Sequence, residues 1–356
     1  MLDKRAATGC MGGVTVPAPC RLSLDASALV HNWRLLAAMS GGAACGAAVK
    51  ADGYGLGAEA VTRHLAAAGC RDFFVSSWRE AAALADGGLT IVVLHGARAE
   101  DIPLATTLPW ARPMLNTAGQ VARWRDAGGG PCDVMVDTGM HRLGIAPADI
   151  AAGLLDGLDI DTLASHLACA DEDVAMNEAQ RARFAALAGR TAARRMSLAN
   201  SAGIALGAGY RFDLVRPGVA LYGGVPRAEL GAIRQVATPE AQVLQVRRVA
   251  AGGAVGYNAT WLAPADTRVA ILNLGYADGY WRGFSGQGQA RAGDRVLPVI
   301  GRVSMDLIAV DCGDADVAEG DWMALDYALP RAAAASGMSQ YELLTGLGAR
   351  FDRMWR

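Results

Sequence analysis

The sequence predicts a (β/α)8 barrel of the TIM type followed by a mostly-β C-terminal domain. Between about residues 45 and 220, short apolar runs alternate with Ala-rich helical segments, which is the pattern of parallel strands joined by helices. Beyond about residue 235, short alternating runs separated by Gly, Asp and Pro indicate a β domain. We therefore expect an N-terminal extension over residues 1–20, the barrel over 21–234 and the β domain over 235–356.

Eight strand-like runs occur in the first region, and eight strand–helix units close a barrel of this type. They span residues 46–50, 72–76, 90–95, 110–115, 132–137, 162–166, 196–199 and 214–216. Helical periodicity between them is clearest over residues 59–68, 80–85, 118–127 and 178–195. The runs of the β domain span residues 241–249, 267–272, 296–300, 307–310 and 322–324. A doubly wound open sheet is the alternative to the barrel, because strands are easily miscounted in a single sequence.

The composition argues against several functional classes. The 356 residues are 52% hydrophobic and carry a formal net charge of −2, so attraction to nucleic acid or to an anionic membrane is not expected. The seven widely spaced cysteines include no CxxC pair and only five histidines accompany them, which favours reduced thiols over disulfides or a metal site. No run reaches the roughly 18 apolar residues of a membrane helix, and the N-terminus lacks a signal-peptide core, so a cytoplasmic location is expected.

Polar residues gather where the predicted barrel strands end, which is where barrel enzymes carry their active sites. These residues are Lys50 with Asp52 and Tyr54, Asp137 with Arg142, His166, Asn200 with Ser201, and Arg216 with Gly218. A lysine at the end of an apolar strand, in mostly apolar surroundings, would have its charged form disfavoured. Such an amine is available for Schiff-base chemistry, although Lys50 could equally point outward into solvent.

Residues 49–57, Val-Lys-Ala-Asp-Gly-Tyr-Gly-Leu-Gly, resemble the cofactor-lysine motif of the alanine racemase family. The resemblance extends from about residue 21 to residue 355. It implies a barrel that binds pyridoxal 5'-phosphate (PLP), followed by a β domain. It also implies that Lys50 bonds covalently to PLP and that Tyr54 contacts the phosphate.

Further matching segments imply the residues that surround the cofactor ring. Residues 136–144 resemble the segment whose arginine, here Arg142, hydrogen-bonds the phenolic oxygen of PLP. Arg216 resembles the arginine that faces the pyridine nitrogen, and His166 the histidine that links it to the catalytic tyrosine. Because arginine stays protonated, it would disfavour protonation of that nitrogen and so suppress side reactions such as transamination. The ordinary alternatives are a solvated arginine for Arg142 and a structural histidine for His166.

The phosphate is expected at the start of a helix. Residues 200–203 could begin one, with Asn200 and Ser201 at an N-terminus whose free N–H groups and dipole suit an anion. Gly218 and Val219 could add backbone N–H groups. An ordinary N-cap serine is the alternative for Ser201, and the two roles are compatible.

The second catalytic group is implied in the β domain, where residues 255–261 resemble the segment of the family's catalytic tyrosine, here Tyr257. Racemisation removes a proton from one face of Cα and returns one on the other, so Lys50 and Tyr257 would serve opposite faces. A tyrosine is a weak acid, and the His166–Arg216 pair would help it to act as a base. An exposed aromatic at a strand end is the alternative for Tyr257.

The same resemblance implies the substrate residues and the assembly. Segments 275–282 and 301–306 suggest Tyr276 and Arg282 near the way in for substrate, with Met305 and Asp306 near its carboxylate, where Arg142 also contributes. In the family these elements reach the lysine of the other subunit, which implies a head-to-tail homodimer with two shared sites.

Four positions depart from the family pattern. Met135 stands where some members carry a lysine that is converted to a carbamate and holds the arginine equivalent to Arg142. Ser197 replaces a histidine that often supports Arg216, which could loosen the hydrogen bonds that tune Tyr257. Trp355 replaces a tyrosine near the phosphate, and His141 replaces a frequent glycine.

The favoured function is an alanine racemase that makes D-alanine, for cell-wall synthesis. The alternatives are a broad-specificity or serine-preferring racemase, a non-catalytic PLP-binding protein, and a decarboxylase of similar architecture. A binding protein would match only the barrel, whereas this chain has a full β domain with Tyr257. A decarboxylase would place an acidic residue near the ring nitrogen, and Arg216 argues against it.

Overall fold

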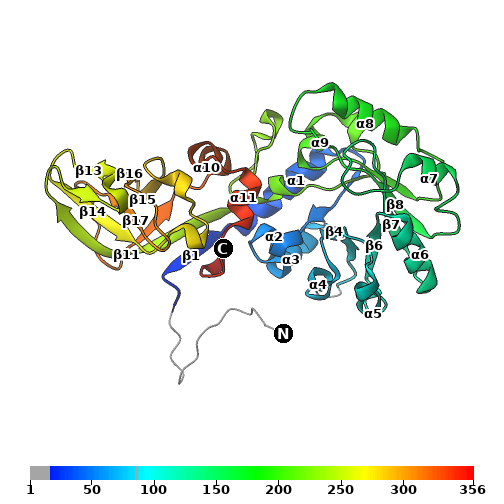
Figure 1. Ribbon diagram of the computed structural model, residues 1–356, viewed down its shortest axis with the longest axis horizontal. Helices are drawn as coiled ribbons and strands as arrows, with labels where there is room; N and C mark the ends of the chain where they lie inside the picture. Colours follow the sequence, from blue (N-terminus) through cyan, green and yellow to red (C-terminus); the bar gives the residue numbers. More distant parts are fainter. Residues whose placement is uncertain (1–16, 85–86) are drawn as a thin grey trace, which may run out of the picture. The chain divides into compact units, whose positions relative to one another are not determined.

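The computed structural model describes residues 17–84 and 87–356, which form two compact units (Figure 1). One unit is Ser27–Arg234, and the other joins the described residues up to Ala26 to Gln235–Arg356. The chain passes from one unit to the other between Arg234 and Gln235. Most of the N-terminal extension, residues 1–16, lies outside the described residues.

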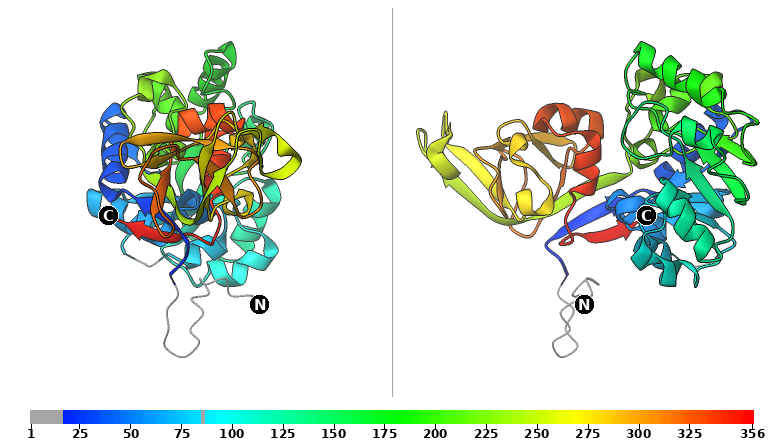
Figure 2. Two further views of the ribbon diagram at one scale, coloured as in Figure 1. Left: turned by 90° about the vertical axis from the view of Figure 1, so that its left-hand side faces the viewer. Right: turned by 45° about the vertical axis from the view of Figure 1, so that its right-hand side comes forward.

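Parallel strands curl into a barrel in the unit Ser27–Arg234 (Figures 1 and 2). Seven pair side by side in chain order: β3 (Ala47–Ala48), β4 (Asp72–Val75), β5 (Thr90–Val93), β6 (Ala111–Leu115), β7 (Cys132–Met135), β8 (Ile160–Ala164) and β9 (Arg195–Ser197). The short pair β2 (Ala44–Cys45) and β10 (Leu214–Val215) lies between the two ends of this sheet.

Backbone hydrogen bonds across this short pair close the ring. The N–H groups of Asp213 and Arg216 donate to the carbonyls of Met196 and Ala199, at 3.0 and 2.9 Å, and so join β10 to β9. On the other side Gly46 donates to Val215 at 3.0 Å. β2 and β3 are two halves of one barrel strand interrupted at Gly46, where a Cβ would lie 2.8 Å from the Asp72 carbonyl. The eight predicted strands are therefore all present among the described residues, and the barrel is confirmed over the open sheet.

Helices follow most of the strands. They are α1 (Ala26–Met39), α3 (Ala58–Ala68), α4 (Trp78–Ala82), α5 (Ile102–Ala105), α6 (Ala118–Asp126), α7 (Pro147–Ala151), α8 (Ala175–Ala185) and α9 (Ser201–Ala205). The helix expected over 178–195 is much shorter, because the chain leaves it after Ala185 and turns at Gly189, whose φ is +70°. The helix expected over 80–85 ends at Ala82, and residue 85 lies outside the described residues.

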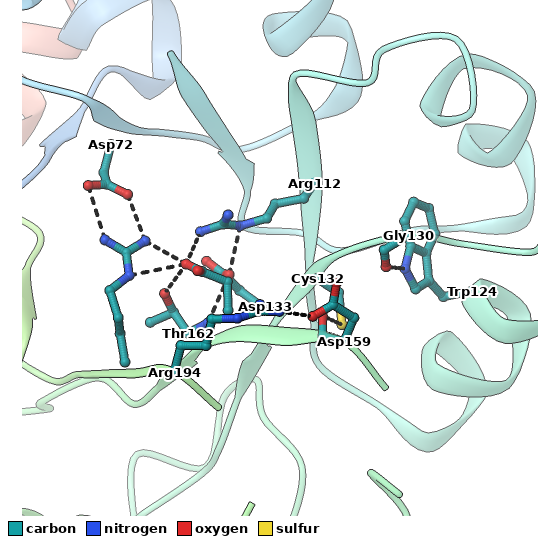
Figure 3. A network of polar contacts seen from close by, with 11 residues as sticks. Asp72, Arg112, Trp124, Gly130, Cys132, Asp133, Asp159, Thr162 and Arg194 are labelled. Carbon is teal, nitrogen blue, oxygen red and sulfur yellow. Dashed lines mark hydrogen bonds and ion pairs between the residues drawn. The ribbon is translucent and has the colours of Figure 1, made fainter. Parts of the chain in front are cut away.

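A cluster of charged side chains lies where the barrel strands begin (Figure 3). We name it the floor cluster: Asp72, Arg112, Asp133, Asp161 and Arg195. Arg195 Nη2 lies 2.8 Å from Asp72 Oδ1 and 2.6 Å from Asp161 Oδ2, and Arg112 bridges Asp161 and Asp133 at 2.5 and 2.8 Å. Burial raises the pKa of Asp133 to about 7, against the opposing charge of Arg112. In barrels this end serves stability, and function resides at the other end.

The second unit is built on an antiparallel ring. The ring strands are β11 (Ala237–Val249), β14 (Thr267–Leu272), β15 (Gln289–Ala292), β16 (Arg295–Ile300), β17 (Ile308–Asp311) and β18 (Trp322–Leu325). The long β11 pairs with β18 through its first half and with β14 through its second, which closes the ring. A small hairpin, β12 (Ala254–Val255) with β13 (Trp261–Leu262), and helices α10 (Leu329–Ser336) and α11 (Gln340–Thr345) complete the unit.

One expectation needs correction here. Residues 21–24 were expected in the barrel, but strand β1 (Cys20–Leu24) pairs antiparallel with β11 and parallel with β19 (Asp352–Trp355) of the second unit. The reason is its alternation: Cys20, Leu22 and Leu24 are buried together on one face, which suits a strand of an antiparallel sheet. The second unit is mostly β, as expected, with α10 and α11 following β18.

Among the described residues, no helix is long and apolar enough to cross a membrane.

Candidate active site

Lys50 lies two residues beyond the end of β3 and begins a turn of left-handed helix. Ala51, Asp52 and Tyr54 all have positive φ, between 52° and 55°, although none is glycine. Left-handed backbone costs an L-residue roughly 1–2 kcal/mol, so such a turn persists only where its surroundings hold it.

Two carboxylates hold this turn. Glu80 Oε1 accepts the N–H of Ala51 at 3.0 Å, while its Oε2 accepts the N–H of Ser76 at 2.6 Å at the end of β4. Asp52 Oδ1 accepts the N–H of Ala58 at 2.8 Å, at the start of α3. The strained turn is therefore tied to the next strand and the next helix, and the position of Lys50 is set by both.

Lys50 is the only lysine among the described residues, since the chain's other lysine is Lys4. Burial, and then the positive charge of Arg142, lower the pKa of the Lys50 amine, while Glu80 acts in the opposite direction. The structure thus supports an amine that loses its proton more readily than an exposed lysine.

The loop after β7 carries Arg142 and is organised by Asp137. One oxygen of Asp137 accepts the N–H groups of Gly139, Met140 and His141 at 2.8, 3.0 and 3.1 Å. Desolvation opposes ionisation of Asp137, but the hydrogen bonds from Gly139 and His141 outweigh it and lower its pKa. Met135, buried in β7, cannot form a carbamate, and the loop is shaped by Asp137 instead.

Arg216 lies just beyond β10, and its side chain is buried. Its Nη1 donates to Ser197 Oγ, and its Nη2 donates to the carbonyl of Ser165 at 2.5 Å. Ser197 in turn donates to the carbonyl of Leu214 at 2.6 Å. The serine hydroxyl therefore holds the guanidinium directly, while the expected loosening of the hydrogen bonds that tune Tyr257 stays a prediction. Burial lowers the pKa of Arg216 to about 10, so it stays protonated near neutral pH.

His166 lies just beyond β8, near the charged groups of the other predicted site residues. Burial lowers its pKa to about 3, and the positive charges of Arg216, Arg142 and Lys50 act in the same direction. The imidazole is therefore neutral near neutral pH. Lys50, Arg142, His166 and Arg216 were all singled out from the sequence, and the charges among them act on one another's pKa values. We name the place where they lie, at the ends of their strands, the mouth of the barrel.

The expected phosphate site also forms at the mouth. Asn200, rather than Ser201, caps α9, since its side chain accepts the N–H of Gly203 at 2.8 Å. Ser201 Oγ instead accepts the N–H of Gly218 at 2.9 Å and that of Ala220 at 3.2 Å. The Gly218 amide is thus already engaged, contrary to the expectation that it is free for phosphate.

Other donors at this place have no acceptor in the part of the chain that the structure describes. Among the described residues, none accepts the buried backbone N–H of Ala202 or of Val219. Tyr54 stacks on Tyr222 with centroids 4.7 Å apart, and a Cβ on Gly218 would lie 2.3 Å from Tyr54 Oη. Buried N–H groups without partners beside a phenol form a cradle suited to an anion.

The remaining predicted residues lie in the second unit. The side chain of Tyr257 is 67% exposed. The preceding Gly256 lies close to the 301–306 segment, since a Cβ on this glycine would be 3.4 Å from the backbone N of Arg302. The 275–282 segment meets the 301–306 segment, since Tyr276 donates its N–H to the Ser304 carbonyl at 3.0 Å.

Side-chain contacts hold the 275–282 and 301–306 segments in place. The Arg282 guanidinium lies over the ring of Tyr276, 5.0 Å from its centre. Arg350 bridges the buried Asp278 at 2.6 Å and Asp306 at 2.8 Å, while Met305 is 54% exposed. The predicted substrate residues therefore share one part of this unit. Trp355 lies on β19, paired with Leu24.

Several supporting residues were missed by sequence reasoning. Glu80 had a signal, because Ser77 and Glu80 form a capping box at the start of α4 immediately after β4. Ser165 and Tyr222 act on Arg216 and Tyr54 from distant parts of the chain, and no sequence pattern announces such contacts.

Comparison with known proteins gives two family matches. Residues 24–226 match the family model of the alanine racemase N-terminal domain, and residues 236–355 that of the alanine racemase C-terminal domain. The alanine racemase of Acidiphilium cryptum is 42% identical over 94% of this chain and 98% of its own length. That of Jannaschia sp. is 43% identical over 93% of this chain and 97% of its own length.

Solved structures agree. The alanine racemase of Bartonella henselae, determined with covalently bound pyridoxal phosphate, is 33% identical with a TM-score of 0.86, covering 96% of this chain and 100% of that one. The biosynthetic alanine racemase of Pseudomonas aeruginosa is 34% identical with a TM-score of 0.85, covering 95% and 99%.

Proposed function

This chain belongs to the alanine racemase family, and from that premise we propose that it interconverts L-alanine and D-alanine with PLP, by a two-base mechanism. Lys50 and Tyr257 are the two acid–base groups in this proposal. The observation that carries it is the mouth of the barrel, where the positive charge of Arg142 lowers the pKa both of His166 and of Lys50, the one lysine among the described residues.

The residues of the mouth fit PLP. Lys50 would hold it covalently. The N–H groups of Ala202 and Val219, which no described residue accepts, would receive its phosphate, with Ser201, Gly218 and Tyr54 around them. Arg216 would face the ring nitrogen and Arg142 the phenolic oxygen. Asn200 would support the cradle as the cap of α9.

When bound, PLP supplies a conjugated ring that draws electrons from the Cα of an attached amino acid. The chain's own residues do the rest. Lys50, whose pKa is lowered, exchanges a proton with one face of Cα, and the Tyr257 hydroxyl exchanges one with the other face. In the proposed dimer, neutral His166 would connect Arg216 to Tyr257 of the partner subunit, and Arg216, protonated near neutral pH, would keep a proton off the ring nitrogen. Tyr276, Arg282, Met305 and Asp306, with Arg142, would orient the substrate.

We also propose that two copies associate head to tail in the cytoplasm and that the D-alanine serves as a peptidoglycan precursor. Lys50 and Tyr257 belong to different units of the chain, and Tyr257 and Met305 are large apolar side chains left 67% and 54% exposed. Apolar exposure of this kind favours coverage by a partner. Sedimentation of the PLP-loaded protein tests the dimer.

The function is tested by adding PLP-loaded protein to L-alanine, L-serine and L-lysine in parallel and following the enantiomers over time. Approach to a 1:1 mixture with alanine alone is expected. Comparable rates with serine or lysine would change the proposal to a broad-specificity racemase. No conversion of any of the three would contradict it.

The role of Tyr257 is tested separately by Tyr257→Phe. This variant is expected to bind PLP but to lose nearly all exchange of the Cα proton of L-alanine with solvent. Normal racemisation by the variant would show that the second base lies elsewhere.

A further inference from the structure

Helix α8 buries the side chain of Gln180 completely. Its Oε1 accepts the N–H of Ala168 at 2.9 Å, and its Nε2 donates to the carbonyl of His166 at 2.9 Å and to Thr138 Oγ1 at 3.4 Å. A backbone N–H can only donate and a carbonyl can only accept, so these contacts decide which end of the amide is the oxygen. Gln180 therefore joins the loop of His166 to the loop that leads to Arg142.

The hydrogen bonds beyond Gln180 have one consistent direction. Ser165 has a single hydroxyl proton, which it donates to the carbonyl of Val136 at 2.8 Å. Thr138 must then donate to Ser165 Oγ, 2.7 Å away, and its own oxygen accepts from Gln180. The backbone carbonyl of the same Ser165 receives Arg216. One network thus runs from α8 to the group that holds Arg216.

We propose that Gln180 is a positioning residue of the racemase site: it fixes His166 directly and, through Thr138 and Ser165, the acceptor of Arg216. The proposal rests on the proposed function, because these positions matter to catalysis only if PLP binds at the mouth. Gln180, Thr138 and Ser165 are each at most 2% exposed, so water does not readily replace a lost hydrogen bond. Removing the Gln180 amide would force both loops to shift to satisfy their polar groups.

The chain offers a matched control in Gln120 of α6. Its Oε1 accepts the N–H of Asn116 at 2.8 Å, and its Nε2 donates to the carbonyl of His95 at 3.0 Å. Gln120 thus joins the loops after β5 and β6, which carry none of the proposed site residues. Both variants lose a glutamine that links two loops, but only Gln180→Leu loses a link between loops that carry proposed site residues. A difference in kcat between the two variants therefore reports on the site.

Each leucine variant is expected to lose hydrogen-exchange protection in the loops that it holds, residues 138–144 and 166–170 for Gln180→Leu. In the PLP-loaded protein, Gln180→Leu is expected to lower kcat for alanine roughly 10- to 100-fold with a KM within about 3-fold. Gln120→Leu is expected to keep kcat within about 2-fold, because no site residue moves.

Gln180→Glu provides the conservative variant. A protonated carboxyl can accept from Ala168 and donate to His166, whereas an ionised one cannot donate. Its kcat relative to the unsubstituted protein should therefore recover as pH falls, and that of Gln180→Leu should not.

Equal losses of kcat in the two leucine variants, or a Gln180→Glu profile parallel to that of the unsubstituted protein, would overturn the role of Gln180. If Gln180→Leu does not fold, the pH profile of Gln180→Glu decides. Failure of the unsubstituted protein to develop visible PLP absorbance would overturn the proposed function instead. Hydrogen exchange would then still show whether Gln180 holds the two loops, and unchanged protection would refute that as well.

Discussion

The two ends of the barrel both gather charged side chains, but they balance them differently. In the floor cluster, Arg112 and Arg195 lie among three aspartates, and the ion pairs are direct. At the mouth, Lys50, Arg142 and Arg216 provide positive charge, while the carboxylates of Glu80 and Asp137 accept hydrogen bonds from backbone N–H groups. The direct ion pairs of the floor cluster serve stability, whereas the excess positive charge at the mouth suits an anion that comes from outside, such as a phosphate or a carboxylate. Substitutions at the two ends should therefore separate stability from activity.

The largest effect is expected at Lys50. Lys50→Arg keeps the positive charge but removes the amine that bonds PLP, and should lower racemisation by roughly four orders of magnitude or more. The visible absorbance of the loaded protein should disappear. Because the chain has two lysines, Lys4→Arg is the matched control. Borohydride reduction followed by peptide mapping should place the PLP label on Lys50, and a label on Lys4 would contradict the assignment.

The next effect is expected in the floor cluster, on stability. Desolvation opposes ionisation of Asp161, but Arg112 and Arg195 outweigh it and lower its pKa, so its contribution is present near neutral pH and lost as pH falls. Asp161→Asn should lower the free energy of unfolding by about 2–3 kcal/mol at neutral pH, less than for a fully buried pair. The kcat of the folded protein should hardly change. A loss of kcat at full stability would show that the two ends are not independent.

A smaller effect on activity is expected from Ser197→Ala at the mouth. The variant leaves Arg216 without the hydroxyl that accepts from its Nη1, and should lower kcat about 10-fold, which corresponds to one buried hydrogen bond. Ser40→Ala is the control, since Ser40 is also buried and donates to a backbone carbonyl, that of Leu36, in α1. Similar kcat values for the two variants would remove Ser197 from the support of Arg216.

The smallest effect is expected at Asp133. Its folded pKa, about 7, lies above that of an unfolded aspartate, so the folded state binds the extra proton between about pH 4 and pH 7. Stability from this group is therefore present at low pH and is lost as pH rises to 7. Asp133→Asn should remove this slope and so raise the free energy of unfolding more at pH 8 than at pH 5. Thermal unfolding of both proteins at the two pH values measures this difference. An equal change in stability at pH 5 and pH 8 would contradict a proton bound to Asp133 in the folded state.

Much of this protein was predictable from local patterns. The eight barrel strands follow from apolar runs that are buried on both faces of a parallel sheet, and all eight occur. Lys50, Arg142, His166 and Arg216 were identified because strand ends of a barrel meet at one place. The helix that was expected over 178–195 failed because a turn at Gly189 depends on a single φ angle, which composition does not reveal.

What the sequence by itself determined is the order of strands and helices and the chemical identity of the groups at the mouth. Only the tertiary structure decided how those groups are held: the left-handed turn after Lys50, the hydroxyl of Ser197 under Arg216, and the amide of Gln180 between two loops. It also decided that β1 joins the second unit. The physical reason is that strand and helix patterns arise from neighbours along the chain, whereas these contacts join residues far apart in it. Their energies depend on burial and on which donor meets which acceptor.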